Sequence, residues 1–131
     1  MVIGVGIDLI EVERVGRRVQ RGEAFKRKVF TPAEIAYCEK QAHPGQHFAA
    51  RFAAKEAFFK ALGTGWSGDM QFYEVEVQHL PSGRPGLLLH GSCRQLAAQM
   101  GVTHIHLSLT HLAASAAAVV VLEGEAPPGK Q

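Results

Sequence analysis

Two carboxylates lie in stretches of the sequence that are otherwise apolar. Asp8 is the one charged residue in the run from Val2 to Ile10. Glu56 belongs to a helical pattern over residues 47–62, with phenylalanine on one side and alanine on the other. A carboxylate that is removed from water needs a cation, a set of hydrogen bonds or a proton. Two such carboxylates brought together would form an oxygen-ligand site for a hard divalent metal.

Three cations share the helical pattern with Glu56, namely Arg51, Lys55 and Lys60. Because neither side of this helix is purely polar, we expect its charges at the rims, against other parts of the protein. One interpretation is an ordinary ion pair between Glu56 and Lys60, which lie four residues apart and would stabilise the helix by about a few tenths of a kcal/mol. The other is a site for a metal ion and an anion. The residues alone leave both open.

The helical pattern ends at Gly63, Thr64 and Gly65. Gly63 suits a left-handed helix C-cap, which requires no function. Alternatively, the backbone amides of this turn contact a phosphate. The motif is not a Walker A loop, because no Gly-Lys-Ser/Thr sequence follows it.

Three histidines lie on one predicted strand near the C-terminus. His104 and His106 share a face, and we expect a solvated or intersubunit pair there, because no third metal ligand is close in sequence. His111 follows at the end of this strand. Strand ends are common positions for functional side chains, although one histidine alone proves nothing.

Basic residues cluster around a predicted helix over residues 11–20. Its arginines are Arg14, Arg17, Arg18 and Arg21. They form either a solvated helix surface or a docking patch for an acidic partner. Since no aromatic stacking series or nucleic-acid motif accompanies them, we do not expect nucleic acid as the partner.

The elements that must position these residues follow from local patterns. We expect a buried strand over 2–8, whose Gly4 and Gly6 allow a close approach beside Asp8. Thr31 and Glu34 form a capping box for a further helix. The remaining pattern predicts strands over 71–79, 87–90, 103–110 and 114–122 and a helix over 92–100. The fold class is α+β.

Length and composition limit the possibilities further. The chain has 131 residues, of which 47% are apolar, and a net charge of +2, which indicates one globular domain. Its two cysteines have no metal-finger spacing and fit a reduced protein. The longest apolar stretch, 112–122, is too short to cross a membrane, and no signal peptide is evident. We therefore expect a cytoplasmic protein that does not bind membranes, with a domain over 1–123 and a flexible tail over 124–131.

Five motifs follow one another along the chain. They are Gly6-Ile7-Asp8, Phe30-Thr31-x-x-Glu34, the run from Arg51 to Gly65, Gly83-x-Pro85, and Ser108-Leu109-Thr110-His111. In this order they resemble the short, single-domain bacterial holo-acyl-carrier-protein synthases, which are 4′-phosphopantetheinyl transferases. The resemblance covers residues 2 to about 123. It implies a small antiparallel sheet packed on a long central helix, and a homotrimer with active sites between subunits.

The resemblance also implies the reaction and its residues. Coenzyme A would donate 4′-phosphopantetheine to a serine of an acidic acyl carrier protein, in fatty acid biosynthesis. Asp8 and Glu56 would bind Mg²⁺, and Lys60 would contact the phosphates or help to deprotonate the serine. The arginines of the first helix would dock the carrier. The residues implied to line the coenzyme are Arg51, Lys55, Gly63, Thr64, Gly65, Gly83, Pro85 and His111.

This chain departs from the family pattern at two places. Residues 79–82 read His-Leu-Pro-Ser where relatives often carry Asn or Asp, which affects the expected adenine-side contacts. Thr110 replaces the usual serine and keeps the hydroxyl. Two other functions remain open: a metal-dependent pyrophosphate or phosphodiester hydrolase that uses Asp8 and Glu56, and a non-catalytic adaptor for an acidic partner.

Overall fold

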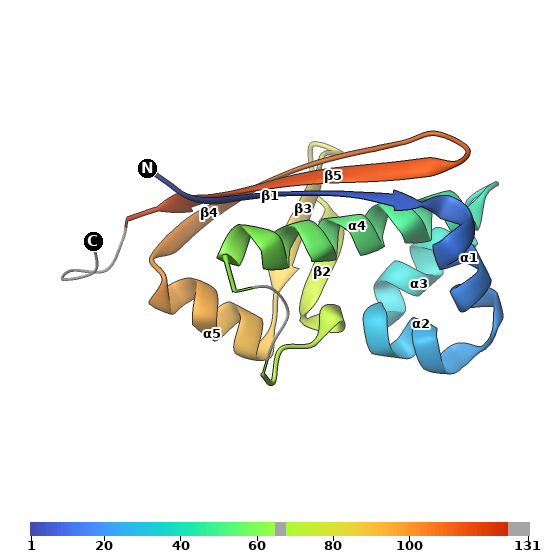
Figure 1. Cartoon of the computed structure of the whole chain (residues 1–131), viewed down its shortest axis with the longest axis horizontal. Coiled ribbons are helices and arrows are strands. Elements are labelled where there is room, and N and C mark those ends of the chain that lie inside the picture. Colours follow the sequence, from blue (N-terminus) through green and yellow to red (C-terminus); the bar gives the residue numbers. More distant parts are fainter. Residues whose placement is uncertain (65–67, 126–131) are drawn as a thin grey trace.

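The computed structural model describes residues 1–64 and 68–125. The chain forms an α+β fold, as the sequence predicts (Figure 1). Its elements are β1 (Val2–Glu11), α1 (Val12–Gln20), α2 (Glu23–Val29), α3 (Pro32–Glu39), α4 (Pro44–Leu62), a 3₁₀ turn (Phe72–Glu74), β2 (Val75–His79), β3 (Pro85–Leu89), α5 (Gly91–Gln99), β4 (Val102–His111) and β5 (Ser115–Gly124).

A three-stranded antiparallel sheet lies along the central helix α4. Its strand order is β1-β5-β4, and β2 and β3 form a separate hairpin. Helices α1 to α3 surround one end of α4, and α5 lies toward the other end (Figure 1). The expected small sheet on a long helix is therefore present. Among the described helices, none combines the length and apolar character that a membrane span needs.

Glycine and alanine allow β1 to lie directly against α4. A Cβ atom at Gly4 would overlap the carbonyl oxygen of Ala61, and one at Gly6 would overlap that of Ala57. The close approach expected from the glycine face is thus made by the backbone of α4. Because side chains alternate along a strand, Asp8 is on the same face as Gly4 and Gly6 and is directed toward the helix.

The opposite face of β1 corrects one expectation. The side chains of Val5, Ile7 and Leu9 are 58%, 66% and 73% exposed, so the strand is not buried on both faces. The sequence pattern is misleading because apolar residues alternate along an exposed strand face in the same way as along a core face.

Several element boundaries also differ from expectation; β1 continues to Glu11, and β3 begins at Pro85. Helix α4 begins at Pro44, because proline suits the first helical position, rather than near residue 47. The strand expected over 71–79 begins at Val75, since the Glu74 side chain accepts hydrogen bonds from the Gln71 and Ser92 amides and stabilises a 3₁₀ turn. Strand β5 includes the buried Gly124, the first residue of the expected tail. Residues 126–131 of that tail lie outside the described residues.

Candidate active site

Asp8 and Glu56 line the same cavity, although 48 positions separate them in the sequence. Strand β1 supplies Asp8, and α4 supplies Glu56 and Lys60. The cavity has a volume of about 430 Å³. Its other lining residues are Leu9, Ile10, Arg14, Val15, Arg18, Phe25 and Phe52. The close packing of β1 on α4 therefore brings the two carboxylates together, which the sequence could not establish.

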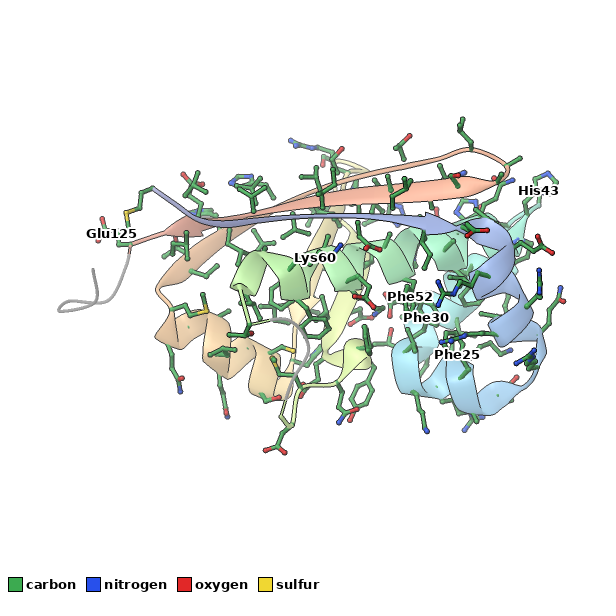
Figure 2. All side chains as sticks on the ribbon, viewed as in Figure 1. Phe25, Phe30, His43, Phe52, Lys60 and Glu125 are labelled. Carbon is green, nitrogen blue, oxygen red and sulfur yellow. The ribbon has the colours of Figure 1, made fainter. Side chains whose placement is uncertain are left out.

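Lys60 links the helix to the strand at this cavity. Its Nζ donates hydrogen bonds to Asp8 Oδ1 and to the Ile7 carbonyl oxygen, each at 3.0 Å. Figure 2 shows Lys60 directed from α4 toward β1. The Lys60 side chain remains 53% exposed, whereas that of Asp8 is 15% exposed. Lys60 therefore holds the Asp8 carboxylate in place while its ammonium group stays accessible to a ligand.

The electrostatics of Glu56 would favour a cation in this cavity. Partial burial raises the pKa of Glu56, the negative charge of Asp8 raises it further, and Lys60 opposes both. Two facing carboxylates fit Mg²⁺, which commonly binds through one or two carboxylates and completes its coordination with water and substrate phosphates. Among the described residues, no group of three or more histidine, cysteine, aspartate or glutamate side chains forms a metal site. The two carboxylates therefore suit an ion whose coordination is completed by water and substrate, rather than an ion that is held by protein ligands alone.

Gly63 ends α4 three residues after Lys60. Its φ of 81° is left-handed, and its amide donates to the Lys60 carbonyl, as expected for a C-cap. Gly63 and Thr64 are exposed and continue from the end of the helix that carries Lys60. Gly65 lies outside the described residues.

Arg51 and His111 lie in a second cluster, away from the carboxylates. The Arg51 guanidinium stacks over the Tyr37 ring at 4.2 Å, and the side chain is 3% exposed. The His111 ring lies 5.1 Å from that of His47. In the described part of the chain, Arg51 Nε and His111 Nδ1 are buried without a hydrogen-bond partner. The cluster therefore has unused donor or acceptor capacity.

The β2–β3 hairpin reaches this second cluster. The His79 ring contacts Tyr37 at 4.7 Å, and His79 pairs with Pro85 in the strand register. Gly83 closes the hairpin turn with a φ of 87°. The structure thus divides the expected coenzyme contacts into two groups: Lys60 with the Gly63 turn, and Arg51 with His111 and the hairpin.

Lys55 belongs to neither group, which corrects the idea that the cations of α4 share one site. It is fully buried, and its Nζ donates to Glu34 Oε1 at 2.8 Å, the Val75 carbonyl at 2.6 Å and the Phe72 carbonyl at 3.2 Å. Three acceptors satisfy an ammonium group. Lys55 therefore has no donor left for a coenzyme and instead joins α4 to α3 and β2.

The four arginines of α1 and its C-terminal end are exposed, and two of them border the cavity. Arg14 and Arg18 line the cavity, and with Arg17 and Arg21 they line the adjoining surface groove. Arg18 also lies over the Phe25 ring at 5.7 Å. The arginine surface is therefore continuous with the site that holds the two carboxylates.

Several residues of both clusters were absent from the predicted site. Phe25 and Phe52 stack 6.3 Å apart in the cavity wall, and Figure 2 shows them beside Phe30. The aromatic pattern of α4 indicated Phe52 as a packing residue. In the second cluster, Tyr37 and His47 were also missed, because neither residue belongs to a sequence pattern that indicates a function.

Comparisons with known proteins agree on one family. Residues 4–120 match the family model described as the 4′-phosphopantetheinyl transferase superfamily. The chain is 48% identical over 124 residues to the holo-acyl-carrier-protein synthase of Solibacter usitatus, covering 94% of this chain and 99% of that protein. The crystal structure of the Neisseria meningitidis synthase matches with a TM-score of 0.85 and 31% identity, over 94% of this chain and 99% of that one. A Bacillus anthracis synthase in complex with CoA (3′,5′-ADP) matches with a TM-score of 0.76 and 32% identity, over 95% and 99%.

Proposed function

Because this chain belongs to the 4′-phosphopantetheinyl transferase superfamily, we propose that it transfers 4′-phosphopantetheine from coenzyme A to a serine of apo acyl carrier protein. The observation that carries the proposal is the cavity that Asp8, Glu56 and Lys60 share, which opens beside the exposed arginines of α1. It combines a site for a metal and phosphates with a surface for an acidic protein substrate.

The proposed transfer is a displacement at the pyrophosphate of coenzyme A. The serine Oγ forms a bond to the phosphorus that carries the pantetheine arm, and the bond from that phosphorus to the bridging oxygen breaks. The electron pair leaves with adenosine 3′,5′-bisphosphate, and the serine proton is released. Charge on the phosphate oxygens is the main quantity to stabilise in such a reaction.

The residues of the cavity suit this task. Asp8 and Glu56 would hold Mg²⁺, which would neutralise phosphate charge and orient the pyrophosphate. Lys60 already donates two hydrogen bonds to oxygen atoms. An ammonium group in this donor role favours phosphate stabilisation over deprotonation of the serine. Asp8 depends on Lys60 for its orientation, so the two residues act as a unit.

The two separate groups of coenzyme contacts support a composite site. Arg51 and Glu56 are five residues apart, so they project from α4 about 140° apart and about 7.5 Å apart along its axis. One coenzyme could reach both groups more directly if a neighbouring subunit supplied the second. The exposed Val5, Ile7 and Leu9 face offers an apolar surface for that neighbour. These observations favour the homotrimer that the family resemblance implies.

Acidic carrier proteins fit the surface beside the cavity. Arg14, Arg17, Arg18 and Arg21 present exposed cations next to the lining of the active site. Complementary charge would mainly accelerate and orient docking. Action within fatty acid biosynthesis and a cytoplasmic location are parts of the same proposal.

The decisive experiment is mass spectrometry of an apo acyl carrier protein after incubation with this protein, coenzyme A and Mg²⁺. We expect the carrier to gain one phosphopantetheine, with release of adenosine 3′,5′-bisphosphate. Cleavage of coenzyme A without carrier protein would instead identify a hydrolase. An unmodified carrier that still binds tightly would identify an adaptor.

A further inference from the structure

Four histidines surround the second cluster, and the proposed function uses one of them. Besides His111, they are His47 on α4, His43 just before α4, and His79 on β2. The His47 ring contacts those of His111 at 5.1 Å and Tyr37 at 5.9 Å. Figure 2 shows His43 at the end of α4 opposite to Lys60. His47 is therefore placed among coenzyme-binding candidates but has no assigned role.

Two buried nitrogen atoms in this cluster are available to hydrogen-bond a ligand. Arg51 is 3% exposed and its Nε has no hydrogen-bond partner among the described residues, and the same holds for His111 Nδ1. A buried cationic donor without an acceptor is strongly unfavourable. Both atoms lie around the aromatic rings of Tyr37 and His47. An anion bound there would accept a hydrogen bond from Arg51 Nε, and from His111 Nδ1 in the form of the ring that carries a proton on that atom.

The ionisable side chains that act on His47 are all basic. Partial burial lowers its pKa below the ordinary histidine value, and the nearby His111, Arg51, His43 and His79 lower it further, in that order. These groups come from α4, the residue before it, β2 and β4, while α3 contributes the Tyr37 hydroxyphenyl ring. In the free protein, burial and these basic neighbours thus favour the neutral form of His47. A bound anion would reverse this balance and favour the protonated imidazole.

We propose that His47 is a further coenzyme-binding residue, which joins Arg51 and His111 in binding a phosphate group and takes up a proton as it does so. The inference rests on the proposed function, in which coenzyme A is the phosphopantetheine donor. It assigns to His47 a role in donor affinity and none in the transfer step at Asp8 and Glu56.

The proposal predicts the sign of a pH effect. His47 is neutral above its lowered pKa in the free protein and protonated in the complex, so binding consumes a proton between the two pKa values. Affinity for coenzyme A therefore increases as pH falls through this interval, by at most about tenfold per pH unit for one proton. Below the free-state pKa the residue is already charged and no further gain is expected.

Isothermal titration of the full chain with coenzyme A, without carrier protein, tests the proposal. Titrations from about pH 5.5 to 8, in buffers of different ionisation enthalpy, count the protons taken up. We expect His47→Gln to take up about one proton fewer than the wild type and to bind about tenfold more weakly near the acid end. His90→Gln is the matched control, because His90 pairs with Glu76 outside the cluster.

The result that overturns the proposal is His47→Gln with the affinity and proton uptake of the wild type. A thermal unfolding curve for each variant establishes that it is folded. If His47→Gln does not fold, titration of the wild type decides the matter. A wild type that takes up no proton when it binds the phosphates of coenzyme A would also overturn the proposal. Comparison with dephospho-coenzyme A distinguishes the sources, because loss of the uptake identifies the 3′-phosphate and its retention identifies the pyrophosphate.

Failure of this inference is distinguishable from failure of the proposed function. A carrier protein that gains no phosphopantetheine from the wild-type enzyme would contradict the function, whatever the titrations show. A carrier that is modified normally, with His47→Gln indistinguishable from the wild type in coenzyme binding, would contradict the role of His47 alone.

Discussion

Lys60 Nζ lies 3.0 Å from Asp8 Oδ1, across the contact between α4 and β1. This ion pair joins the two elements that carry the carboxylates, and among the described residues no ion pair is formed by Glu56, which lines the same cavity. Two acids and one lysine therefore share a cavity. A divalent metal would balance the charge of the two carboxylates, and a phosphate would balance the charge of the lysine.

The metal assignment predicts that Asp8→Ala and Glu56→Ala each reduce carrier modification by at least about a hundredfold, because each removes half of the protein's ligands. Initial rates at millimolar Mg²⁺, read by mass spectrometry, measure the loss. Glu125→Ala is the control, since Glu125 is exposed and lines neither the cavity nor the arginine groove. A near-normal rate in either cavity variant would contradict the assignment.

The raised pKa of Glu56 predicts that this residue lowers the stability of the folded protein at neutral pH. A carboxyl whose folded-state pKa lies above its unfolded value favours folding below the unfolded pKa, and that contribution is lost as pH rises through the folded pKa. Glu56→Gln should therefore raise the unfolding temperature at neutral pH without metal, while abolishing transfer. Adding Mg²⁺ should stabilise the wild type but not the variant. The same melting temperature for both proteins without metal would count against this account.

The buried pair of Lys55 and Glu34 predicts a loss of stability without a specific effect on the coenzyme. Lys55→Met leaves the Glu34 carboxylate buried and uncompensated, which costs about 3–5 kcal/mol. Urea unfolding measures this loss. Adding Glu34→Gln to the Lys55→Met variant should restore part of the stability, because the glutamine amide places no charge at this buried position. If folded Lys55→Met had a markedly higher KM for coenzyme A, Lys55 would have to contact the ligand after all.

The close contact between β1 and α4 predicts opposite effects for two glycine substitutions. Gly6→Ala would place a methyl group against the backbone of Ala57 and Ala61, which should destabilise the fold by about 1–3 kcal/mol or more and displace Asp8. Gly16→Ala is the matched control. Gly16 lies within α1 with open space around it, so alanine should stabilise the helix by about 0.5–1 kcal/mol. Denaturant curves compare the two, and equal effects would exclude the proposed packing.

The arginine surface predicts a salt-dependent effect on the carrier protein. Arg14→Glu and Arg21→Glu should raise the KM for carrier protein about tenfold at low salt, and the difference should shrink as salt screens the charges. Arg94→Glu is a suitable control because α5 is at the other end of α4 (Figure 1). Steady-state rates at several salt concentrations would show this pattern. An unchanged carrier KM in both variants would locate the docking surface elsewhere.

Local features of this protein were determined by the sequence alone. The capping box of Thr31 and Glu34 and the left-handed Gly63 occur as predicted, because each depends on residues within one turn of the chain. The strand predicted over 103–110 is also present, and Ile105, Leu107 and Leu109 alternate along it and pack on the core. The ordered motifs also sufficed to indicate the family that the comparisons confirm.

Only the tertiary structure decided which charges meet. Asp8 and Glu56 share a cavity because Gly4 and Gly6 let β1 approach the alanines of α4, whereas Lys55, one residue before Glu56, faces Glu34 instead. Successive residues of a helix point about 100° apart, so one motif on α4 contributes both to the candidate active-site cavity and to a buried structural pair. The position of His47 beside His111 likewise depends on the end of β4 reaching α4. Such contacts between distant elements are set by packing, which no local pattern encodes.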